Sequence, residues 1–345
     1  ASKSRGLGDV YKRQEKVLQS GKSNDLEDCF HSESHWRDLL AFTGTISPYG
    51  GAKEISLGLN SFQKIAQAHS FRIIDKHAQP RLVNRLGRPV IEAIFAFETK
   101  LGRGEGVVRV PENSQKTAWT FLTTLSELRG FPEKVGLNRP SGEAYSRNFG
   151  GSNWLDQRQE SIKFSDREPA VLVVGGGQAG LAVAARLGQL EIETLVIDKH
   201  DRIGDNWRKR YHSLALHNQI HVNHLPYLPF PPTWPKYIPK DMLANWFELY
   251  ADVMQVNFWT GTELINANYD GRLNHWVATV RQNNNSEKIL KPKHIIFANG
   301  VSGIPYKPKL DGLCDFRGEV LHSEGFSNGA EWTGKRAAVL GTGNS

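Results

Sequence analysis

Cysteine is scarce in this sequence of 345 residues, which contains only Cys29 and Cys314. The two residues are far apart and form no Cys-x-x-Cys pair. Disulfide frameworks, thiolate zinc sites and dithiol redox centres all need closely spaced or more numerous cysteines. We therefore expect none of the three in this protein.

Long hydrophobic runs are also missing. The longest candidates, such as Ala170–Val174, have the length of a β-strand, far below the ~20 residues that cross a bilayer. The N-terminus is polar and lacks the apolar core of a signal peptide. We expect a cytoplasmic protein without a membrane partner.

The sequence also lacks a concentrated basic segment. The net charge is +7, but the lysines and arginines are scattered and no long basic run contains interleaved aromatic residues. A solvated surface and attraction for anionic phosphate cofactors account for such a balance. We therefore expect small-molecule ligands and no nucleic acid.

The chain before the first domain is expected to be a disordered tail, residues 1–33. Within it, Gly6–Gln14 resembles a peptide that recurs as a translated sequencing-adaptor artefact. Residues 1–14 are therefore assigned to no folded element.

Residues 34–127 are expected to form an α+β unit. Apolar spacing of i, i+3 and i+4 predicts a helix over Trp36–Phe42, and a second short helix is expected over Phe62–His69. Three β-rich runs follow, the last two joined as a hairpin: Val90–Glu98, Gly106–Val110 and Thr117–Leu125. This order resembles the nuclear-transport-factor-2-like (NTF2-like, SnoaL-like) cone. The resemblance implies either a dimerisation or packing module, which would make a homodimer, or a small-molecule pocket.

Residues 128–167 contain glycines and prolines that interrupt every periodic pattern, and they are expected to be a linker in which Trp154 and Leu155 provide local anchors. A domain over 168–334 follows. It begins with a buried-strand run, Pro169–Val174, then an Ala/Leu-rich helix, Leu181–Leu190, then a second strand, Thr194–Ile197. Strand, helix and strand in this order predict an α/β, Rossmann-type parallel sheet.

The loop between the first strand and the helix reads Gly-Gly-Gly-Gln-Ala-Gly, which is a complete GxGxxG motif. Gly175 permits a tight turn, Gly177 lets the backbone approach a pyrophosphate, and Gly180 lets the helix pack closely on the strand. The pyrophosphate then lies at the helix N-terminus, where free N–H groups and the helix dipole favour negative charge. The loop therefore predicts a dinucleotide site.

Asp198 ends the second strand, 18 residues after Gly180. A carboxylate at this place accepts hydrogen bonds from the ribose hydroxyls of the adenosine. Its charge also repels a 2′-phosphate, so the expected ligand is FAD or NAD rather than NADP.

A second glycine loop, Gly341–Ser345, follows another apolar strand-like run, Ala337–Leu340. Two loops imply two nucleotides, as hydride transfer from a nicotinamide to a flavin requires. Residues 335–345 are then the start of an NAD(P)H-binding domain, with NADP held by Gly341, Gly343, Asn344 and Ser345. The sequence stops inside this loop, so we expect an incomplete fold that does not turn over by itself.

From about Glu168 onward the sequence resembles class B flavin-containing monooxygenases, with the YUCCA-type indole-pyruvate monooxygenases as near relatives. Four segments carry this resemblance besides the first glycine loop. They are Gly204–Arg208 with the following RYHSLALH, the proline-rich Leu225–Pro231, the strand end Phe297–Gly300, and Phe316-x-Gly318-x3-His322-x3-Phe326, which is similar to the monooxygenase fingerprint.

The resemblance implies FAD and NADPH as cofactors, O2 and a small organic molecule as substrates, and transfer of one oxygen atom through a C4a-peroxyflavin. Asn218 and Asn223 are the candidate catalytic residues, because neutral amides can donate hydrogen bonds near the flavin. The candidate FAD-binding residues are Gly175, Gly177, Gln178, Ala179, Gly180, Asp198, Lys199, Asn206, Trp207, His217, Ala298 and Gly300.

Two departures from the family pattern leave the subclass open. Asn299 replaces a threonine, and Phe326 stands where flavin monooxygenases carry tyrosine and Baeyer–Villiger enzymes carry tryptophan. Baeyer–Villiger oxygenation of a ketone therefore stays an alternative, as does a non-catalytic flavin-binding scaffold with an NTF2-like binding module.

Other classes fit less well. A flavin disulfide reductase needs a redox cysteine pair, and a single-nucleotide NAD dehydrogenase does not need the fingerprint ending at Phe326. His217, His221 and His224 have a spacing that suits metal ligands, but Asn218, Asn223 and Pro226 make a regular helix doubtful there. We expect no metal site.

Overall fold

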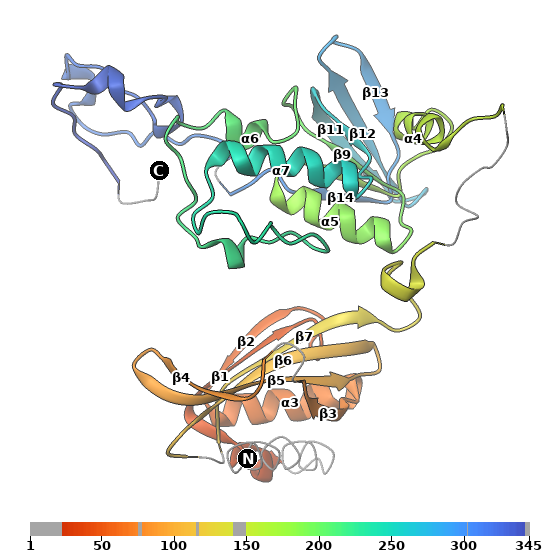
Figure 1. Ribbon diagram of the computed structural model, residues 1–345, viewed down its shortest axis with the longest axis vertical. Helices are drawn as coiled ribbons and strands as arrows, with labels where there is room; N and C mark the ends of the chain where they lie inside the picture. The colour runs from red at the N-terminus through yellow and green to blue at the C-terminus, as the bar shows by residue number, and fades with distance from the viewer. Residues whose placement is uncertain (1–22, 75–77, 115–116, 141–149, 302, 342–345) are drawn as a thin grey trace. The chain divides into compact units, whose positions relative to one another are not determined.

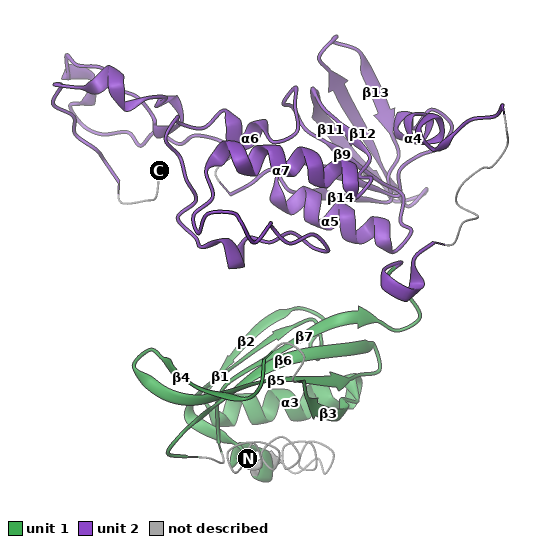
Figure 2. Cartoon of the chain, in the orientation of Figure 1, with its two compact units in different colours: residues 1–133 green, residues 134–345 purple. Residues whose placement is uncertain are grey.

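The computed structural model describes residues 23–74, 78–114, 117–140, 150–301 and 303–341. The chain divides into two compact units, residues 1–133 and 134–345 (Figure 2). Each unit has its own hydrophobic core, and each is described here by itself.

The N-terminal unit is a curved sheet with helices on one face (Figure 1). Its strands have the order β2-β1-β7-β6-β5-β3, and β4 pairs with β5. The elements are α2 (Ser23–Glu27), β1 (Phe30–Leu39), β2 (Ile46–Gly50), α3 (Ala52–Ala66), β3 (His69–Ile73), β4 (Arg81–Arg85), β5 (Arg88–Glu98), β6 (Gly102–Pro111) and β7 (Ala118–Leu128).

Aromatic side chains fill the space between this sheet and α3. The rings of Phe95 and Phe121 stack with centroids 5.4 Å apart, and Ile55 and Leu59 of α3 are completely buried among the same cluster. The expected strands β5, β6 and β7 are confirmed, and β6 and β7 are antiparallel neighbours as the predicted hairpin requires.

The helix predicted over Trp36–Phe42 is wrong, because most of that segment belongs to strand β1. Ser34, Trp36 and Asp38 are fully buried and alternate with exposed residues, which is the period of a strand. Two of the three inward side chains are polar, so a count of apolar residues misses the alternation. Asp38 is satisfied inside the core: its carboxylate accepts hydrogen bonds from the Thr123 hydroxyl (2.6 Å) and the Phe42 backbone N–H (3.0 Å).

The disordered tail predicted over residues 1–33 also needs correction. Residues 1–22 lie outside the described part of the chain, but α2 and the start of β1 are folded. Leu26, Cys29 and Phe30 are buried in the core of the N-terminal unit. Their apolar character is spread over a short, polar segment, which hides it from a composition argument.

A buried carboxylate lies on the other face of this sheet. Glu92 of β5 accepts hydrogen bonds from Arg81 (3.0 Å), Arg85 (2.9 Å) and Arg109 (2.7 Å). Burial alone raises the pKa of Glu92, but the hydrogen bonds from the three arginines outweigh it and lower the pKa to about 2.

Glu92 should make the N-terminal unit sensitive to acid. Its pKa is depressed in the folded state, so its stabilising effect is complete above pH 4.5 and is lost as the pH falls toward 2. The shift corresponds to as much as about 3 kcal/mol of unfolding free energy. Chemical denaturation between pH 6 and pH 2 should show that the unfolding free energy of wild type exceeds that of Glu92→Gln at pH 6 and that this difference shrinks toward pH 2. A difference between the two proteins that stays constant with pH would contradict the assignment.

The C-terminal unit contains a parallel sheet and an antiparallel meander. The parallel sheet has the order β10-β9-β8-β14, and the meander has the order β11-β12-β13. The elements are α4 (Trp154–Lys163), β8 (Val171–Val174), α5 (Gln178–Gln189), β9 (Thr194–Ile197), α6 (Asp205–Arg208), α7 (Lys240–Val253), β10 (Phe258–Trp259), β11 (Thr262–Asp270), β12 (His275–Gln282), β13 (Glu287–Leu290) and β14 (His294–Phe297).

Both faces of the parallel sheet are covered, as its continuous apolar strands require. Val173 and Val196 pack in the same cluster as α5 and α7. Leu172 and Leu195 point the other way, into a cluster with the meander. The predicted strand–helix–strand order is confirmed, although α5 begins at Gln178, three residues before the predicted start.

The predicted linker, residues 128–167, contains more structure than its glycines and prolines indicate. It holds the end of β7, a short 3-10 helix, Gly136–Asn138, and the ten-residue α4. Asn153 caps α4 through a reciprocal capping box with Asp156. Trp154 and Leu155 are about half exposed, so they are not the local anchors that we expected.

The end of the described chain is irregular. After β14 it forms only 3-10 turns: η4 (Leu313–Asp315), η5 (Ser323–Gly325) and η6 (Gly329–Trp332). The strand predicted over Ala337–Leu340 is not formed; Val339 and Leu340 are exposed, and no described strand pairs with them. A strand needs a partner, which an apolar sequence alone does not supply.

None of the described helices has both the length and the apolar character that spanning a bilayer requires.

Candidate functional site

The glycine loop joins the end of β8 to the start of α5, at the carboxyl edge of the parallel sheet. The Gly175 N–H donates to the Ile197 carbonyl (2.9 Å), which continues the pairing of β8 with β9 into the loop. Gly177 is the N-cap of α5 and no side chain caps it. The first N–H groups of a 12-residue helix therefore face the loop without a side-chain acceptor.

Two of the motif glycines are required by the fold itself. Gly175 has φ +107°, which disfavours other residues, and an added Cβ would lie 2.6 Å from the Ala298 carbonyl oxygen. A Cβ at Gly180 would lie 2.0 Å from the Gly175 carbonyl oxygen. The same Cβ would lie 3.4 Å from a Val173 methyl group of β8, so Gly180 allows close packing of the helix on the strand, as predicted, and on the loop.

Gly177 differs from these two. Its backbone has φ −79° and ψ −167°, which any residue can adopt. An added Cβ would meet only the Asn206 side-chain amide at 3.1 Å among the described residues. Neither conformation nor packing demands a glycine here, so the space over Gly177 is available to a ligand that approaches the backbone.

Gly176 is a third constrained glycine, at a position that the motif leaves open. A Cβ there would overlap the ring of Phe258, 2.1 Å from its Cζ. Phe258 belongs to β10, the parallel neighbour of β9. The sequence contains no local signal that links positions 176 and 258, because sheet pairing alone brings them together.

Asp198 lies beside the loop, as predicted, but its carboxylate already has protein partners. Oδ2 accepts a hydrogen bond from the Gly176 N–H (2.7 Å), and Oδ1 accepts one from the His200 N–H (2.9 Å). The His200 ring Nδ1 is 2.6 Å from the same oxygen. Asp198 thus fixes the loop, and its hydrogen bonds to a ribose stay a prediction.

Removing this carboxylate should loosen the loop. In Asp198→Ala the Gly176 N–H loses its acceptor, and we expect about 2 kcal/mol less unfolding free energy. Denaturant unfolding and amide exchange at Gly176 measure the effect. Asp311→Ala, which changes an exposed aspartate, serves as the control. Equal stability of the two variants would show that Asp198 does not fix the loop.

The short helix α6 brings two more predicted residues to the loop. Asn206 lies over Gly177, and the Trp207 indole N–H donates to the Gln178 side-chain oxygen at 3.4 Å. Gly204, with φ +88°, lets α6 pack against α7: a Cβ there would lie 2.4 Å from the Ala244 carbonyl oxygen. Burial raises the pKa of Asp205 in α6, but hydrogen bonds from Arg208 and Lys209 outweigh it and lower the pKa.

The end of β14 is the third element at this edge. Ala298 donates its N–H to the Val174 carbonyl (2.7 Å), and its own carbonyl lies against Gly175. Gly300 has φ +83° and open space around it. Lys199, next to Asp198, is exposed.

The candidate catalytic amides, Asn218 and Asn223, belong to the segment that precedes the proline-rich stretch. Asn218 is exposed, and Asn223 donates to the backbone carbonyls of Gln219 (2.9 Å) and Asn218 (3.3 Å). Within the described chain no hydrogen bond joins either side chain to the glycine loop. His217 is exposed in the same segment. This arrangement favours a turn-capping role for Asn223, while a catalytic role is untested.

The second glycine loop falls mostly outside the described residues, which end at Gly341. Gly343, Asn344 and Ser345 therefore stay predictions. The fingerprint segment is described: His322 caps η5 by accepting from the Glu324 N–H (3.2 Å), and the Phe326 ring lies 6.1 Å from that of Tyr211. His322 thus has a structural role in this chain.

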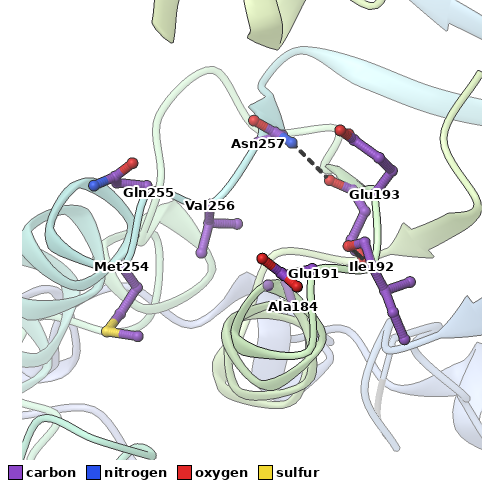
Figure 3. A pocket seen from close by; sticks show the side chains of 10 residues that line it. Ala184, Glu191, Ile192, Glu193, Met254, Gln255, Val256 and Asn257 are labelled. Atoms are coloured by element: carbon purple, nitrogen blue, oxygen red, sulfur yellow. Dashed lines mark hydrogen bonds between the residues drawn. The ribbon is translucent and has the colours of Figure 1, made fainter. Parts of the chain in front are cut away.

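A small cavity of about 240 Å³ lies at the opposite end of α5 (Figure 3). It is lined by residues that follow α5, such as Glu191, and by residues that follow α7, such as Met254 and Val256. Gly177 precedes the first residue of α5, whereas the lining of this cavity begins at Ala184 and continues past the end of the helix. The cavity is therefore not part of the glycine-loop site.

The residues at the loop fit a pyrophosphate. The uncapped start of α5 offers N–H groups and the positive end of the helix dipole to an anion. Gly177 leaves room for close approach, and Asn206 can donate a hydrogen bond from the other side. The described residues of the loop therefore offer hydrogen-bond donors that suit an anion.

Two solved structures are similar to part of this chain. The flavin-containing monooxygenase from Stenotrophomonas maltophilia shares 23% identity, with a TM-score of 0.43 over 48% of this chain and 48% of that one. The S-allyl-L-cysteine S-oxygenase from Allium sativum shares 15% identity, with a TM-score of 0.44 over 47% of this chain and 43% of that one.

Curated relatives match the same part of the sequence. The indole-3-pyruvate monooxygenase YUCCA1 from Oryza sativa subsp. japonica is 32% identical over 178 residues, which are 51% of this chain and 43% of that protein. The probable indole-3-pyruvate monooxygenase YUCCA8 from Arabidopsis thaliana is also 32% identical, over 50% of this chain and 42% of that protein. The chain thus spans less than half the length of these relatives.

A family model matches over residues 168–345, about half of the chain, and its description is flavin-binding monooxygenase-like. The matched region contains the glycine loop, Asp198 and the fingerprint segment. The chain therefore belongs to the flavin-binding monooxygenase-like family.

Proposed function

We propose that residues 168–345 hold the FAD of an NADPH-dependent monooxygenase, which inserts one oxygen atom from O2 into a small organic molecule. The observation that carries this proposal is Gly177, a glycine that neither backbone conformation nor packing requires, placed at the uncapped N-terminus of α5. Bound flavin would supply the redox and oxygen chemistry.

The residues of this chain would position that cofactor. Backbone N–H groups at Gln178 and Ala179 would bind the pyrophosphate, and Asn206 would donate to it from α6. Asp198 would accept from the ribose while it keeps its bond to the Gly176 N–H. Ala298, at the end of β14, and Trp207 would enclose the cofactor and exclude water.

NADPH is proposed as the reductant because the family resemblance includes a second glycine loop from Gly341 onward. Indole-3-pyruvate is the substrate named for the curated relatives, and we propose an apolar keto acid, amine or sulfide as the substrate class. Baeyer–Villiger oxygenation of a ketone is the second candidate, since Phe326 replaces the tyrosine of the flavin monooxygenase fingerprint.

The N-terminal unit is proposed to have an NTF2-like fold. The observation in favour is a curved sheet with α3 packed on one face. A role in homodimer formation or in ligand binding is consistent with that fold.

Turnover is best tested on the longest form of the protein that its reading frame encodes. After FAD loading, NADPH oxidation and oxygenated product are measured with an amine, a sulfide, a ketone and indole-3-pyruvate. We expect oxidation that depends on one of these substrates and yields one oxygenated product per NADPH. FAD that is bound and reduced but gives only hydrogen peroxide with all four would contradict the proposed monooxygenase.

A further inference from the structure

The N-terminal unit has a cavity of about 630 Å³, within the range of small-molecule sites. It opens on the sheet and on the tip of the β4–β5 hairpin, and its lining includes His35, Arg85, Leu86, Arg109, Trp119 and Thr120. These residues belong to the part of the chain outside the family match, so the flavin site does not account for them.

The sheet register explains how the polar side chains meet. Glu92, Arg109, Thr120 and His35 are paired in sequence across β5, β6, β7 and β1. Their neighbours along the strands, such as Ile91 and Phe121, point into the aromatic core. The row is therefore on the face of the sheet that α3 does not cover.

The arginines around Glu92 carry more positive charge than its carboxylate neutralises. Arg81, Arg85 and Arg109 all bind the single carboxylate of Glu92, which leaves a surplus of two charges (3 − 1 = 2). Each guanidinium has five N–H donors, whereas a carboxylate offers about four acceptor positions. Arg85 and Arg109 line the cavity with side chains 42% and 32% exposed, so their remaining donors can reach a ligand.

Apolar groups stand beside these donors. Trp119 lines the cavity, with the Arg88 guanidinium 4.7 Å above its ring, and Arg88 pairs with Glu33 at 3.4 Å. Leu86 lines the cavity from the two-residue turn of the β4–β5 hairpin.

Leucine is an unfavourable residue for the backbone conformation at position 86. It has φ +53° and precedes Gly87 with φ +78°, a turn in which asparagine–glycine is preferred. The leucine is 97% exposed, so it contributes little to the core. A large apolar side chain in a strained, exposed turn suggests selection for a ligand.

From these observations the geometry points to a second binding site, for a small organic anion with one carboxylate and a flat apolar body. Arg109 and Arg85 would bind the ligand's carboxylate. Its charge, added to that of Glu92, would neutralise a second of the three arginines. Trp119 and Leu86 would contact the apolar body. The Glu92 carboxylate holds the guanidinium groups in place before the ligand arrives.

Calorimetric titration of the full chain with a naphthalene carboxylate tests this site, and the uncharged carboxamide is the comparison compound. We expect the carboxylate to bind at one site and the carboxamide at least about tenfold more weakly, because it lacks the charge-assisted hydrogen bonds. Saturating FAD should leave the binding unchanged, so this result is independent of the proposed monooxygenase. Equal binding of both compounds, or competition by FAD, would overturn the proposal.

Three variants locate the site. Arg109→Gln should weaken carboxylate binding at least about tenfold. Leu86→Asn should also weaken it, yet should fold at least as stably as wild type because asparagine suits the turn. Arg103→Gln, on the same strand but 69% exposed and paired with Glu127, is the control and should bind normally.

Sedimentation of the same proteins separates a ligand site from an interface. If wild type binds no carboxylate but self-associates, and Leu86→Asn makes it monomeric, the cavity is a contact between copies of the chain and the proposal is wrong. Unchanged carboxylate binding by folded Arg109→Gln and Leu86→Asn would overturn it as well.

Discussion

Gly177→Ala is expected to weaken FAD binding at least about 100-fold while the C-terminal unit stays folded, because two charge-assisted hydrogen bonds to phosphate are worth roughly 3 kcal/mol. The added methyl group lies over the start of α5, where the phosphates would otherwise approach the backbone N–H groups. Asn206, its one close neighbour among the described residues, can shift by the few tenths of an ångström that a 3.1 Å contact requires.

The measurement is an FAD titration of both proteins followed by flavin fluorescence, with thermal unfolding of the apo forms. Gly188→Ala is the matched control, because a Cβ at this α5 glycine has open space in the described structure. Gly188→Ala should bind FAD as wild type does. If Gly177→Ala binds FAD normally, the pyrophosphate does not lie over this glycine.

Gly180→Ala should have the opposite outcome, with folding lost before binding can be measured. The new Cβ would lie 2.0 Å from the Gly175 carbonyl oxygen and 3.4 Å from a Val173 methyl group. Backbone atoms cannot yield as a long side chain does, so α5 must move away from β8. We expect a loss of about 3 kcal/mol or more in the unfolding free energy of the C-terminal unit.

Hydrogen exchange of the β8 and β9 amides measures this loss of stability in the C-terminal unit alone. Exchange in β5 and β6 of the N-terminal unit is the internal control and should not change. Gly188→Ala should slow exchange slightly, since alanine in a helix is favoured over glycine by about 0.5–1 kcal/mol. Equal protection of β8 in Gly180→Ala and wild type would show that the helix packs differently from the structure.

The glycine loop was the part of the site best predicted from sequence, for a physical reason. Gly175 and Gly180 meet demands that are set by a turn and a helix contiguous in the chain, and the structure shows both demands. The approach of a pyrophosphate to Gly177 stays a prediction. Asn206 and Trp207 were identified only through the family resemblance, and α6 places them at the loop. The contact of Gly176 with Phe258 depends on β9–β10 pairing, which no local pattern encodes.

The N-terminal unit shows where sequence patterns fail. Strand β1 turns Ser34 and Asp38 inward, and the two carboxylate oxygens of Asp38 have different partners. Oδ2 accepts from Phe42 and Thr43 nearby in the chain, but Oδ1 accepts from Thr123, 85 residues away. A hydrophobic period does not identify a buried polar residue of this kind. The Glu92 cluster also depends on strand pairing, because its arginines lie 7 to 17 residues away on the two strands that flank β5.

The central claim is that the N-terminus of α5 binds the pyrophosphate of FAD, and equilibrium dialysis of the purified chain against FAD and against riboflavin tests it most directly. Riboflavin has the same ring system but no phosphate. We predict one equivalent of FAD per chain and at least about 100-fold weaker binding of riboflavin. A folded chain that retains neither compound, or binds both equally, would contradict the assignment of the glycine loop as a flavin-nucleotide site.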